Sequence, residues 1–522
     1  MFILFVGFCI VSLISLSFLC KGTSAVLSLT SLRFKGSYWR LGLNFDFIVL
    51  SILLMLFVCF GYAYIYTDHY FSNRKEGKQL QALICLFVGV MTSLVFTGDF
   101  LLTLVFWEYL GVVRFFLILF YLNYVRLRAS VVTLVSSRFG DVCLFLMLAI
   151  SIYKEVDGLF LMIIFGLVIL TKSASFPFIS WLLEAMRAPT PVRSLVHSST
   201  LVAAGVWFRL RYDILLFTTK IMPILVILVI TILITGLCCL TFLDLKKIVA
   251  LSTCKKISWC LIYLILGDQL LCLFQLLRHG VSKCLLFMLV GDVMRGTGGS
   301  QASKCVYSPQ IYGRWGIFSL FSVVLGLSGA PFIGVFFTKH ILLSLFFSIE
   351  RLSMFFILML CVLLSYLYSF RLCHVFYKIN ACVRRGVFIC FSSGAMVYFW
   401  LFVNFFLGGL LDETRPVSRR TSITLLLFQF TACFTAYLFY NSNIVTTWGR
   451  SLWGCDKLVE TTIQLYNTLF NWALMFFYRW DSYILQLFKY NGVYVVKVYK
   501  QNLLKVLFLA SLTSILMCLF II

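Results

Sequence analysis

Ionisable side chains occur inside long apolar runs of this sequence. Glu108 lies in LTLVFWEYLGVV, Lys172 in LVILTKSASFPF and Lys283 in RHGVSKCLLFMLVG. A charge inside a bilayer costs several kcal/mol, so such residues mark functional sites in membrane proteins. Acids, lysines and histidines linked by water can pass a proton, because each group takes up or releases it as a neighbouring charge changes. These residue types therefore predict proton transfer.

The candidate relay groups are two acids, three lysines and two histidines: Glu108, Asp141, Lys172, His197, His279, Lys283 and Lys339. His279 and Lys283 are four residues apart and so share one face of a helix. Asp141 follows Arg138 by three positions, which favours a local ion pair near the end of a span over a place in the relay. We interpret His340, next to Lys339, as an interfacial residue.

Two stretches place helix-breaking residues beside these charges. The segment LTKSASFPFISWLLEAMRAPTPVRSLVHSST (170–200) has three prolines between Lys172 and His197, and GLSGAPFIGVFFTK (326–339) has small residues and a proline before its lysine. Proline removes a backbone donor and interrupts a helix. In a membrane, interrupted helices occur only where protein or water supports the backbone, and beside charges they mark ion paths. We expect two discontinuous helices, related by internal symmetry, along the path.

The elements that position these residues are long apolar helices. The chain has 522 residues, of which 62% are hydrophobic and 12% charged. Apolar runs of about 18 or more residues recur, each long enough to span a bilayer as a helix. They lack the alternation of a transmembrane barrel. The sequence predicts an all-α, polytopic transmembrane bundle of about 15–16 helices, with spans near 2–20, 44–66, 79–97, 99–122, 130–153, 157–176, 193–210, 221–243, 248–267, 269–292, 314–336, 340–349, 354–378, 386–411, 421–441 and 503–522.

The placement of the charged residues and cysteines argues against a nucleic-acid-binding protein and against a metal or disulfide framework. Lys and Arg outnumber Asp and Glu by 43 to 19, but the basic residues gather in short connections such as 72–78, 244–248 and 415–420. Basic connections set the orientation of spans, so nucleic acid is not an expected partner. The 19 cysteines form no Cys-x-x-Cys, and most lie in apolar runs. They are interpreted as small buried hydrophobes, without a metal or disulfide framework.

The last quarter of the chain changes character. Apolar residues at helical spacing follow Trp448, with charged residues on the other faces, as in a helix that lies along a membrane or a partner. The first apolar run is interpreted as a retained span. We divide the chain into N-terminal transmembrane helices (1–97), an antiporter-like proton-translocating core (98–378), C-terminal transmembrane helices (379–445), a lateral amphipathic helix (446–502) and a terminal transmembrane anchor (503–522).

Several motifs resemble the antiporter-like subunits of respiratory complex I, and the lateral segment with its final span is typical of the subunit 5 branch. KSASFPFISWLLEAMRAPTPVRSLVHSSTLVAAG is a long and specific match around the first broken helix. FWEYLGVVRFFLI, SRFGD, DLKKIVALST, RHGVSKCLLFMLVG and LSGAPFIGVFFTKH follow the family order. The resemblance covers nearly the whole chain and is strongest over 100–340.

The resemblance implies roles for individual positions. Glu108 falls on the family's essential glutamate, Lys172 on its partner in the broken helix, and Lys283 on the central lysine beside His279. His197 matches the histidine of the HSST motif, and Lys339 the lysine near the exit. The chain departs from the family pattern at Arg193, where a small serine is usual, at Gln275, where histidine is common, and in CKKIS (254–258).

The resemblance also implies a subunit of the H⁺-translocating NADH:ubiquinone reductase in the mitochondrial inner membrane, with no redox chemistry on this chain. Flavin, iron–sulfur clusters, NADH and ubiquinone are expected on partner subunits, and the partners are other membrane-arm subunits, including neighbouring antiporter-like ones, and the bilayer. The alternatives are a cation/proton antiporter subunit of the related multisubunit type and a membrane scaffold. A scaffold has no use for the buried Glu108 and Lys172, which argues against it.

Overall fold

The computed structural model describes most of the chain in two compact units, Met1–Cys455 and Asp456–Ile522. The described residues are 25–34, 37–72, 74–152, 158–212, 222–296, 299, 301–303, 308–309, 313–330, 335–346, 352–377, 381–382, 397–398, 400–401, 404, 419–439, 452–486 and 510–511.

Long apolar helices make up the first unit. Runs of Leu, Phe, Val and Ile favour helices of more than 18 residues, each about 30 Å long at 1.5 Å per residue. Within the described residues nine helices are long and apolar enough to cross a membrane. They are α2 (Phe47–Phe71), α3 (Lys75–Phe96), α4 (Phe100–Leu119), α5 (Tyr124–Ile152), α10 (Met222–Thr241), α11 (Leu245–Ile265), α12 (Gln269–Gly296), α15 (Leu352–Tyr377) and α17 (Arg419–Phe439).

Both proline-containing stretches interrupt the helices, as the sequence predicts. The first gives α6 (Gly158–Lys172), α7 (Ser180–Ala185), α8 (Thr190–Leu195), a π-helical turn η1 (Val196–Thr200) and α9 (Leu201–Arg211). In the second, α13 (Gly313–Ser328) ends before α14 (Phe336–Phe346) begins. Pro331 itself lies outside the described residues.

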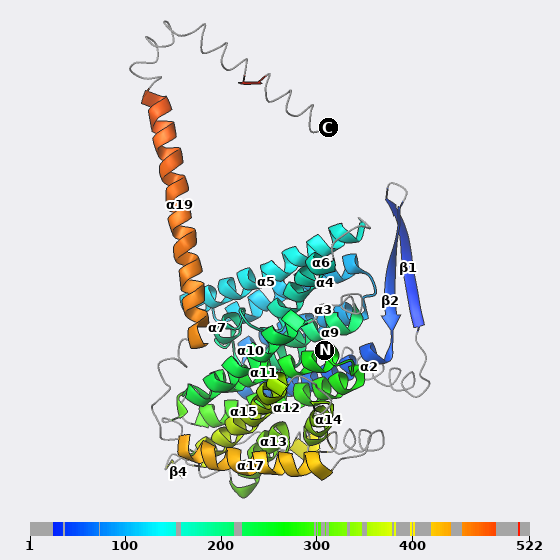
Figure 1. Ribbon diagram of the computed structural model, residues 1–522, viewed down its shortest axis with the longest axis vertical. Coiled ribbons are helices and arrows are strands. Elements are labelled where there is room, and N and C mark those ends of the chain that lie inside the picture. The colour runs from blue at the N-terminus through cyan, green and yellow to red at the C-terminus, as the bar shows by residue number, and fades with distance from the viewer. Residues whose placement is uncertain are drawn as a thin grey trace. The chain divides into compact units, whose positions relative to one another are not determined.

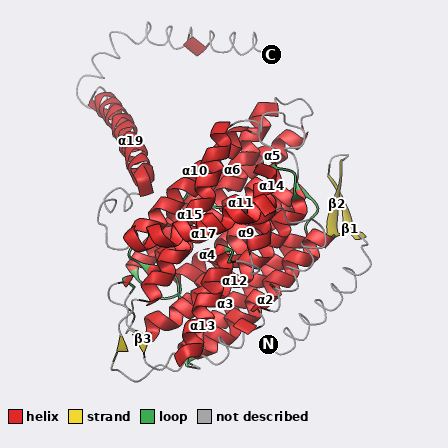
Figure 2. Ribbon diagram, turned by 60° about the horizontal axis from the view of Figure 1, so that its bottom comes forward, coloured by secondary structure: helices red, strands yellow, loops and turns green. Residues whose placement is uncertain are grey.

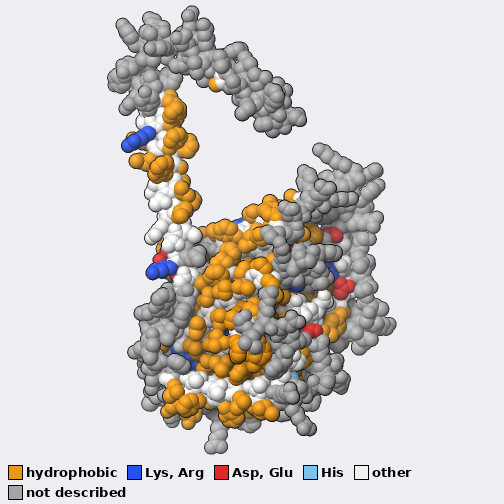
Figure 3. All heavy atoms as spheres, in the orientation of Figure 1, with side chains coloured by type: hydrophobic (Ala, Val, Ile, Leu, Met, Phe, Trp, Pro, Cys, Tyr) orange, Lys and Arg blue, Asp and Glu red, His pale blue; other side chains and the backbone are white. Residues whose placement is uncertain are grey.

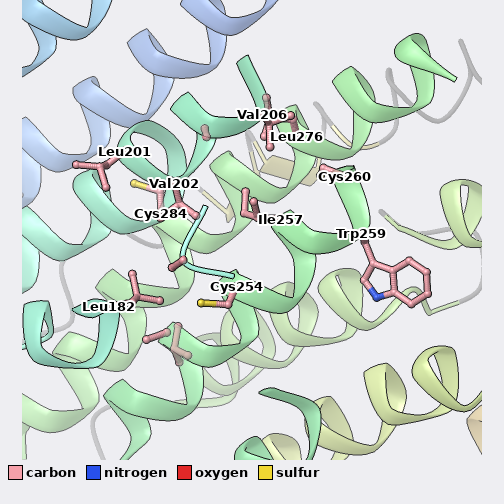
Figure 4. Packing of buried hydrophobic residues seen from close by; sticks show 14 of the residues in the cluster. Leu182, Leu201, Val202, Val206, Cys254, Ile257, Trp259, Cys260, Leu276 and Cys284 are labelled. Carbon is pink, nitrogen blue, oxygen red and sulfur yellow. The ribbon is translucent and has the colours of Figure 1, made fainter. Parts of the chain in front are cut away.

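The core of the unit is the pair α11 and α12. They pack on each other, and α10 packs on both α11 and α15, so these helices lie side by side in Figures 1 and 2. Figure 4 shows side chains of α7, α9, α11 and α12 meeting between the helices, among them Leu182, Val206, Ile257 and Leu276. Nearly all of α11 is buried. Polar residues beyond the first turn of this helix, such as Lys255 and Lys256, are therefore held in the interior.

The outer helices are apolar on the opposite side. On α5, Phe139, Val142 and Phe145 are exposed, and on α4 Tyr109, Val112 and Phe116 are exposed. Figure 3 shows hydrophobic side chains covering much of the visible face of this unit. A helix whose outward face is apolar suits a lipid environment, because lipid offers no penalty for exposed hydrocarbon. The outer surface therefore agrees with a bundle that spans a bilayer.

Two small sheets accompany the helices and were not predicted. β1 (Ala25–Phe34) pairs antiparallel with β2 (Ser37–Phe45), and β3 (Ser308–Pro309) pairs parallel with β4 (Ala381–Cys382). In β2, Trp39, Leu41, Leu43 and Phe45 alternate with other residues, which is the period of a strand. No strand was predicted here, because the spans were predicted from runs of about 18 apolar residues and this stretch contains none.

The predicted polytopic helical bundle is confirmed. The spans near 2–20, 386–411 and 503–522 lie wholly or largely outside the described residues. The short 3₁₀ turn η5 (Leu452–Gly454) lies at the end of the first unit. α19 (Cys455–Gln486), which belongs to the second unit from Asp456 on, is one helix of 32 residues within the predicted lateral segment. The domain boundaries remain predictions.

Candidate functional site

An acidic and basic cluster joins α4, α5 and α6. Arg138 makes an ion pair with Glu108, and its Nη1 lies 3.8 Å from Asp141 Oδ2. Lys172 Nζ lies 3.5 Å from the other oxygen of Asp141. Lys172 and Asp141 are buried, whereas the Arg138 side chain is 47% exposed and that of Glu108 24%. The cluster thus leads from a partly exposed edge to a buried lysine.

Close packing of α5 on α6 sets the position of the buried pair. A Cβ on Gly140 would overlap the hydroxyl of Thr171, so the two backbones approach closely at these residues. Asp141 and Lys172 are the next residues along the two helices. Lys172 Nζ also lies 4.7 Å from the centre of the Trp107 ring, a cation–π contact from α4. Three helices therefore hold the lysine.

Arg114 is a buried cation that the sequence analysis did not single out. Its Nη2 donates to Thr133 O at 2.6 Å and to Ser137 Oγ at 3.0 Å, and its guanidinium lies 5.2 Å from the Trp181 ring centre. Trp181 in turn donates from Nε1 to Thr171 O at 3.0 Å. Arg114 stands in the quoted run FWEYLGVVRFFLI, so a search for every ionisable residue in an apolar run would have found it.

His197 occupies the π-helical turn between the broken segment and α9. The ring is fully buried and lies beside the backbone of Ala185. It is within electrostatic range of Arg114 and Arg193, and its ring centre is 6.5 Å from that of Trp181. Because η1 packs against α12, His197 stands between the Lys172 cluster and the helix that carries the central lysine.

His279 and Lys283 are both fully buried on α12, four residues apart. Lys283 donates to the hydroxyl of Ser252 on α11, and its Nζ lies 3.4 Å from Val249 O. His279 has no hydrogen-bond partner among the described residues and lies within electrostatic range of Lys283 and Lys256. The pair faces polar groups of α11.

Two further buried lysines lie on α11. Lys255 and Lys256 are at most 1% exposed, and Lys255 Nζ lies 5.3 Å from the ring centre of Tyr368. CKKIS (254–258) was interpreted only as a departure from a family motif, and its two lysines were not predicted as site residues. The signal was available, because both lysines fall within a predicted span. A charge near the middle of a span predicts a buried site more strongly than a motif mismatch does.

Lys339 is buried at the start of α14 and donates to Ser328 O at the end of α13. Its Nζ lies 3.4 Å from the centre of the Tyr366 ring. A cavity of about 10 Å³, room for one water, is lined by Lys256, Lys339 and Gln275 among others. The departure Gln275 accepts a hydrogen bond from Thr338 Oγ1 at 2.8 Å. The cavity places one water-sized space between the two lysines.

The interpretation of His340 as interfacial is wrong. The residue is 2% exposed, and its Nε2 lies 2.6 Å from Thr421 Oγ1 on α17. α14 runs on beyond this residue to Phe346, and α17 packs against it.

The structure brings the predicted residues together in part. Glu108 does not pair with Lys172 directly; Arg138 and Asp141 stand between them. The favoured local pair Arg138–Asp141 exists, and the same carboxylate also faces Lys172, which makes Asp141 central to the cluster. Among the residues that the structure describes, no group of three His, Cys, Asp or Glu side chains could hold a metal ion.

Known proteins resemble this chain in sequence and in fold. The NADH:quinone oxidoreductase/Mrp antiporter transmembrane family matches residues 97–367. NADH-ubiquinone oxidoreductase chain 5 of Caenorhabditis elegans is 32% identical over 69% of this chain and 71% of its own, and that of Anopheles quadrimaculatus is 32% identical over 76% and 72%.

Two solved structures share the fold at low sequence identity. The Mrp complex from Dietzia sp. DQ12-45-1b has a chain with a TM-score of 0.73 at 18% identity, covering 89% of this chain and 56% of that one. The membrane-bound sulfane sulfur reductase, an archaeal respiratory membrane complex, gives 0.63 at 16% identity over 84% and 93%. On the family match and the relatives together, the chain belongs to the NADH:quinone oxidoreductase/Mrp antiporter transmembrane family.

Proposed function

We propose that this chain is a proton-translocating membrane-arm subunit of NADH:ubiquinone oxidoreductase in the mitochondrial inner membrane. The observation that carries the proposal is the row of buried ionisable groups through the helical bundle: Asp141, Lys172, His197, His279, Lys283, Lys256 and Lys339, each at most 5% exposed. Ionisable groups inside a membrane bundle cost free energy and are retained where they serve a function. Proton transfer is the function that their chemistry suits.

The cluster around Asp141 supplies the switch. One carboxylate lies between two cations, Arg138 and Lys172, so each competes for its charge. When Arg138 pairs with Glu108, Asp141 stabilises the protonated Lys172. When Arg138 turns to Asp141, Lys172 loses its counter-charge in a buried site and releases its proton. Movement of a single guanidinium thus couples a partly exposed edge to a buried proton donor.

The middle of the path runs through His197 and α12. A neutral imidazole accepts a proton at one nitrogen and donates from the other, and His197 is buried between the Ala185 backbone and the cations Arg114 and Arg193. His279 has the same character beside Lys283. Water between these groups would carry the proton from the cluster to the central lysine.

The path continues over α11 to the second break. Lys256 and Lys339 line one water-sized cavity, and Lys339 is anchored to the carbonyl at the end of α13. An interrupted helix leaves carbonyls without intrahelical partners, and a lysine beside them can hold its proton there. We assign Lys339 to the exit side.

Electron transfer would take place on partner subunits. Flavin, iron–sulfur clusters, NADH and ubiquinone belong there in this proposal, and shifts of charge would reach this chain through neighbouring antiporter-like subunits. The NADH-ubiquinone oxidoreductase names of the relatives support this assignment over a cation/proton antiporter. Sodium exchange by the chain would instead support the antiporter.

The test is NADH-driven proton pumping by the assembled complex with Lys172→Met or Glu108→Gln. We expect the ratio of protons pumped to NADH oxidised to fall while the complex still assembles, because the lysine loses its titratable group or Arg138 loses its second partner. Lys247→Met is the matched control, since Lys247 is partly exposed, pairs with Asp244 at 3.5 Å and lies outside the cluster. Normal pumping in both variants would remove the cluster from the path.

A further inference from the structure

A second polar site lies at one end of the bundle. It is a pocket of about 450 Å³ formed where several helices begin or end. Lining residues come from the carboxyl-terminal ends of α2 and α12 and from the amino-terminal ends of α3, α8 and α11. Because α2, α3, α11 and α12 are long and apolar enough to cross a bilayer, their ends lie near lipid headgroups. No residue of the proposed proton path lines this pocket.

The pocket is positively charged. Arg74, Lys246 and Arg295 line it, and Glu76 is the one acid among the described lining residues, which leaves an excess of two positive charges. Lys246 also lies within electrostatic range of Arg193. Basic pockets between membrane helices bind anionic headgroups, and guanidinium and ammonium groups suit phosphate oxygens.

Hydrogen-bond donors face the same space. Thr190 lines the pocket and is 6% exposed, and its hydroxyl is engaged by the buried Tyr66. Arg295 is held in place by donation to His69 O at 2.8 Å and lies 5.8 Å from the Tyr70 ring centre. With a fixed guanidinium beside it, the pocket is prepared for an anion.

One rim of the pocket is apolar. Tyr121 lines it, is covered by Arg126 at 3.9 Å from its ring centre, and is followed by Leu122, which is 81% exposed. Tyr124 and Val125 are exposed beyond it. A basic pocket next to exposed apolar side chains suits an amphiphile with an anionic head.

We propose that the pocket binds a phosphate-bearing anion, with its phosphate oxygens on Arg74, Lys246 and Arg295. A phospholipid headgroup and free phosphate share this chemistry, and the apolar rim supplies contacts for the acyl chains of the lipid. Binding would tie the ends of α3, α11 and α12 together. The proposal is independent of the proton path, since it concerns a different site.

The experiment compares Arg74→Gln/Lys246→Gln with the matched pair Lys75→Gln/Lys247→Gln in the purified complex. Both variants lose two positive charges at neighbouring positions, but only the first pair lines the pocket. One probe is phosphatidylglycerol with a photoreactive acyl chain, at subsaturating amount, with cross-links mapped to peptides around 119–126. The other is radiolabelled inorganic phosphate in equilibrium binding.

We expect the pocket variant to lose about fivefold in binding for each charge removed, about twenty-five-fold in all, and the control to retain it. Selective loss of the lipid cross-link identifies a lipid headgroup, and selective loss of phosphate binding identifies free phosphate. If neither probe binds, or if both variants lose binding equally, the proposal is wrong. Proton pumping does not enter either readout, so failure of the proton path leaves this result unaffected.

Discussion

At the scale of single residues, a carboxylate shared between two cations is the feature that distinguishes this site. Asp141 faces both Arg138 and Lys172, while Glu108 offers Arg138 a second partner. In the proposed switch, the positive charge of Arg138 moves between these two carboxylates. A simple Glu108–Lys172 pair would lack this alternative. The proposal therefore gives Arg138 as large a role as the lysine.

Arg138→Gln should lower proton pumping about tenfold or more. Without the competing guanidinium, Asp141 stays with Lys172, and a stabilisation of about 1.4 kcal/mol for the protonated lysine slows release by that factor. Arg138→Lys should restore part of the activity because the charge returns. The measurement is proton uptake by vesicles containing the complex, per NADH oxidised.

Arg128→Gln is the control for this change. Arg128 is exposed on the same helix, α5, and lies outside the cluster. If both arginine variants pump equally well, the switch proposed for Asp141 does not operate through Arg138.

Part of this site was predictable and part was not. The apolar flanks of Glu108 and Lys172 single them out in the sequence. The contact between Asp141 and Lys172 joins residues 31 positions apart on different helices, and no sequence pattern gives that distance. Lys256 was not predicted as a site residue, although its span was predicted. Its motif differs from the family pattern, so only its charge inside an apolar span marks it.

At the scale of helices, the close approach of α5 and α6 positions the cluster. Gly140 leaves no room for a side chain beside Thr171, and the acid and lysine follow immediately on the two helices. Small residues allow membrane helices to pack closely. The proline breaks were predicted, whereas the π-helical turn that holds His197 was not, because proline spacing shows where a helix ends and not how the next turn is wound.

Gly140→Ala should destabilise the bundle and impair pumping together. The added methyl group overlaps the Thr171 hydroxyl, and relief requires α5 and α6 to separate, at a cost of about 1–3 kcal/mol. The expected results are a lower midpoint of thermal unfolding and a lower pumping ratio, because Asp141 moves away from Lys172.

Gly111→Ala on α4 is the matched control, since a Cβ there meets no heavy atom within 4 Å. It should leave both measurements unchanged. Equal stability of the two alanine variants would mean that the contact between α5 and α6 adjusts without strain. Gly140 would then have no role in positioning the cluster.

At the scale of the whole molecule, the first unit is apolar outside and polar along part of its interior. Arg114, Arg278 and Lys172 are among its largest fully buried side chains, while aromatic and aliphatic residues face outward. The apolar runs were enough to predict the spans. The hairpin of β1 and β2 was not predicted, because its residues alternate with period two and form no long run.

The second unit presents an apolar face that its own helix cannot bury. α19 would be about 48 Å long at 1.5 Å per residue. Trp472, Met475, Phe476 and Trp480 are exposed at spacings that place them on one side, and the last two rings stack with centres 6.3 Å apart. Figure 3 shows hydrophobic side chains along this helix. We expect neighbouring membrane-arm subunits to cover this face in the complex.

Trp472→Asp tests this expectation. The side chain is 82% exposed, so α19 itself should remain helical, but a carboxylate in an apolar contact is not compensated and should weaken the association. Asn467→Asp, exposed on a different side of α19, adds the same charge and should have no effect. The measurement is the amount of neighbouring antiporter-like subunits that co-purify with the chain after mild detergent treatment. We expect Trp472→Asp to lower it and Asn467→Asp to leave it unchanged; equal amounts from both variants would show that Trp472 does not contact those subunits.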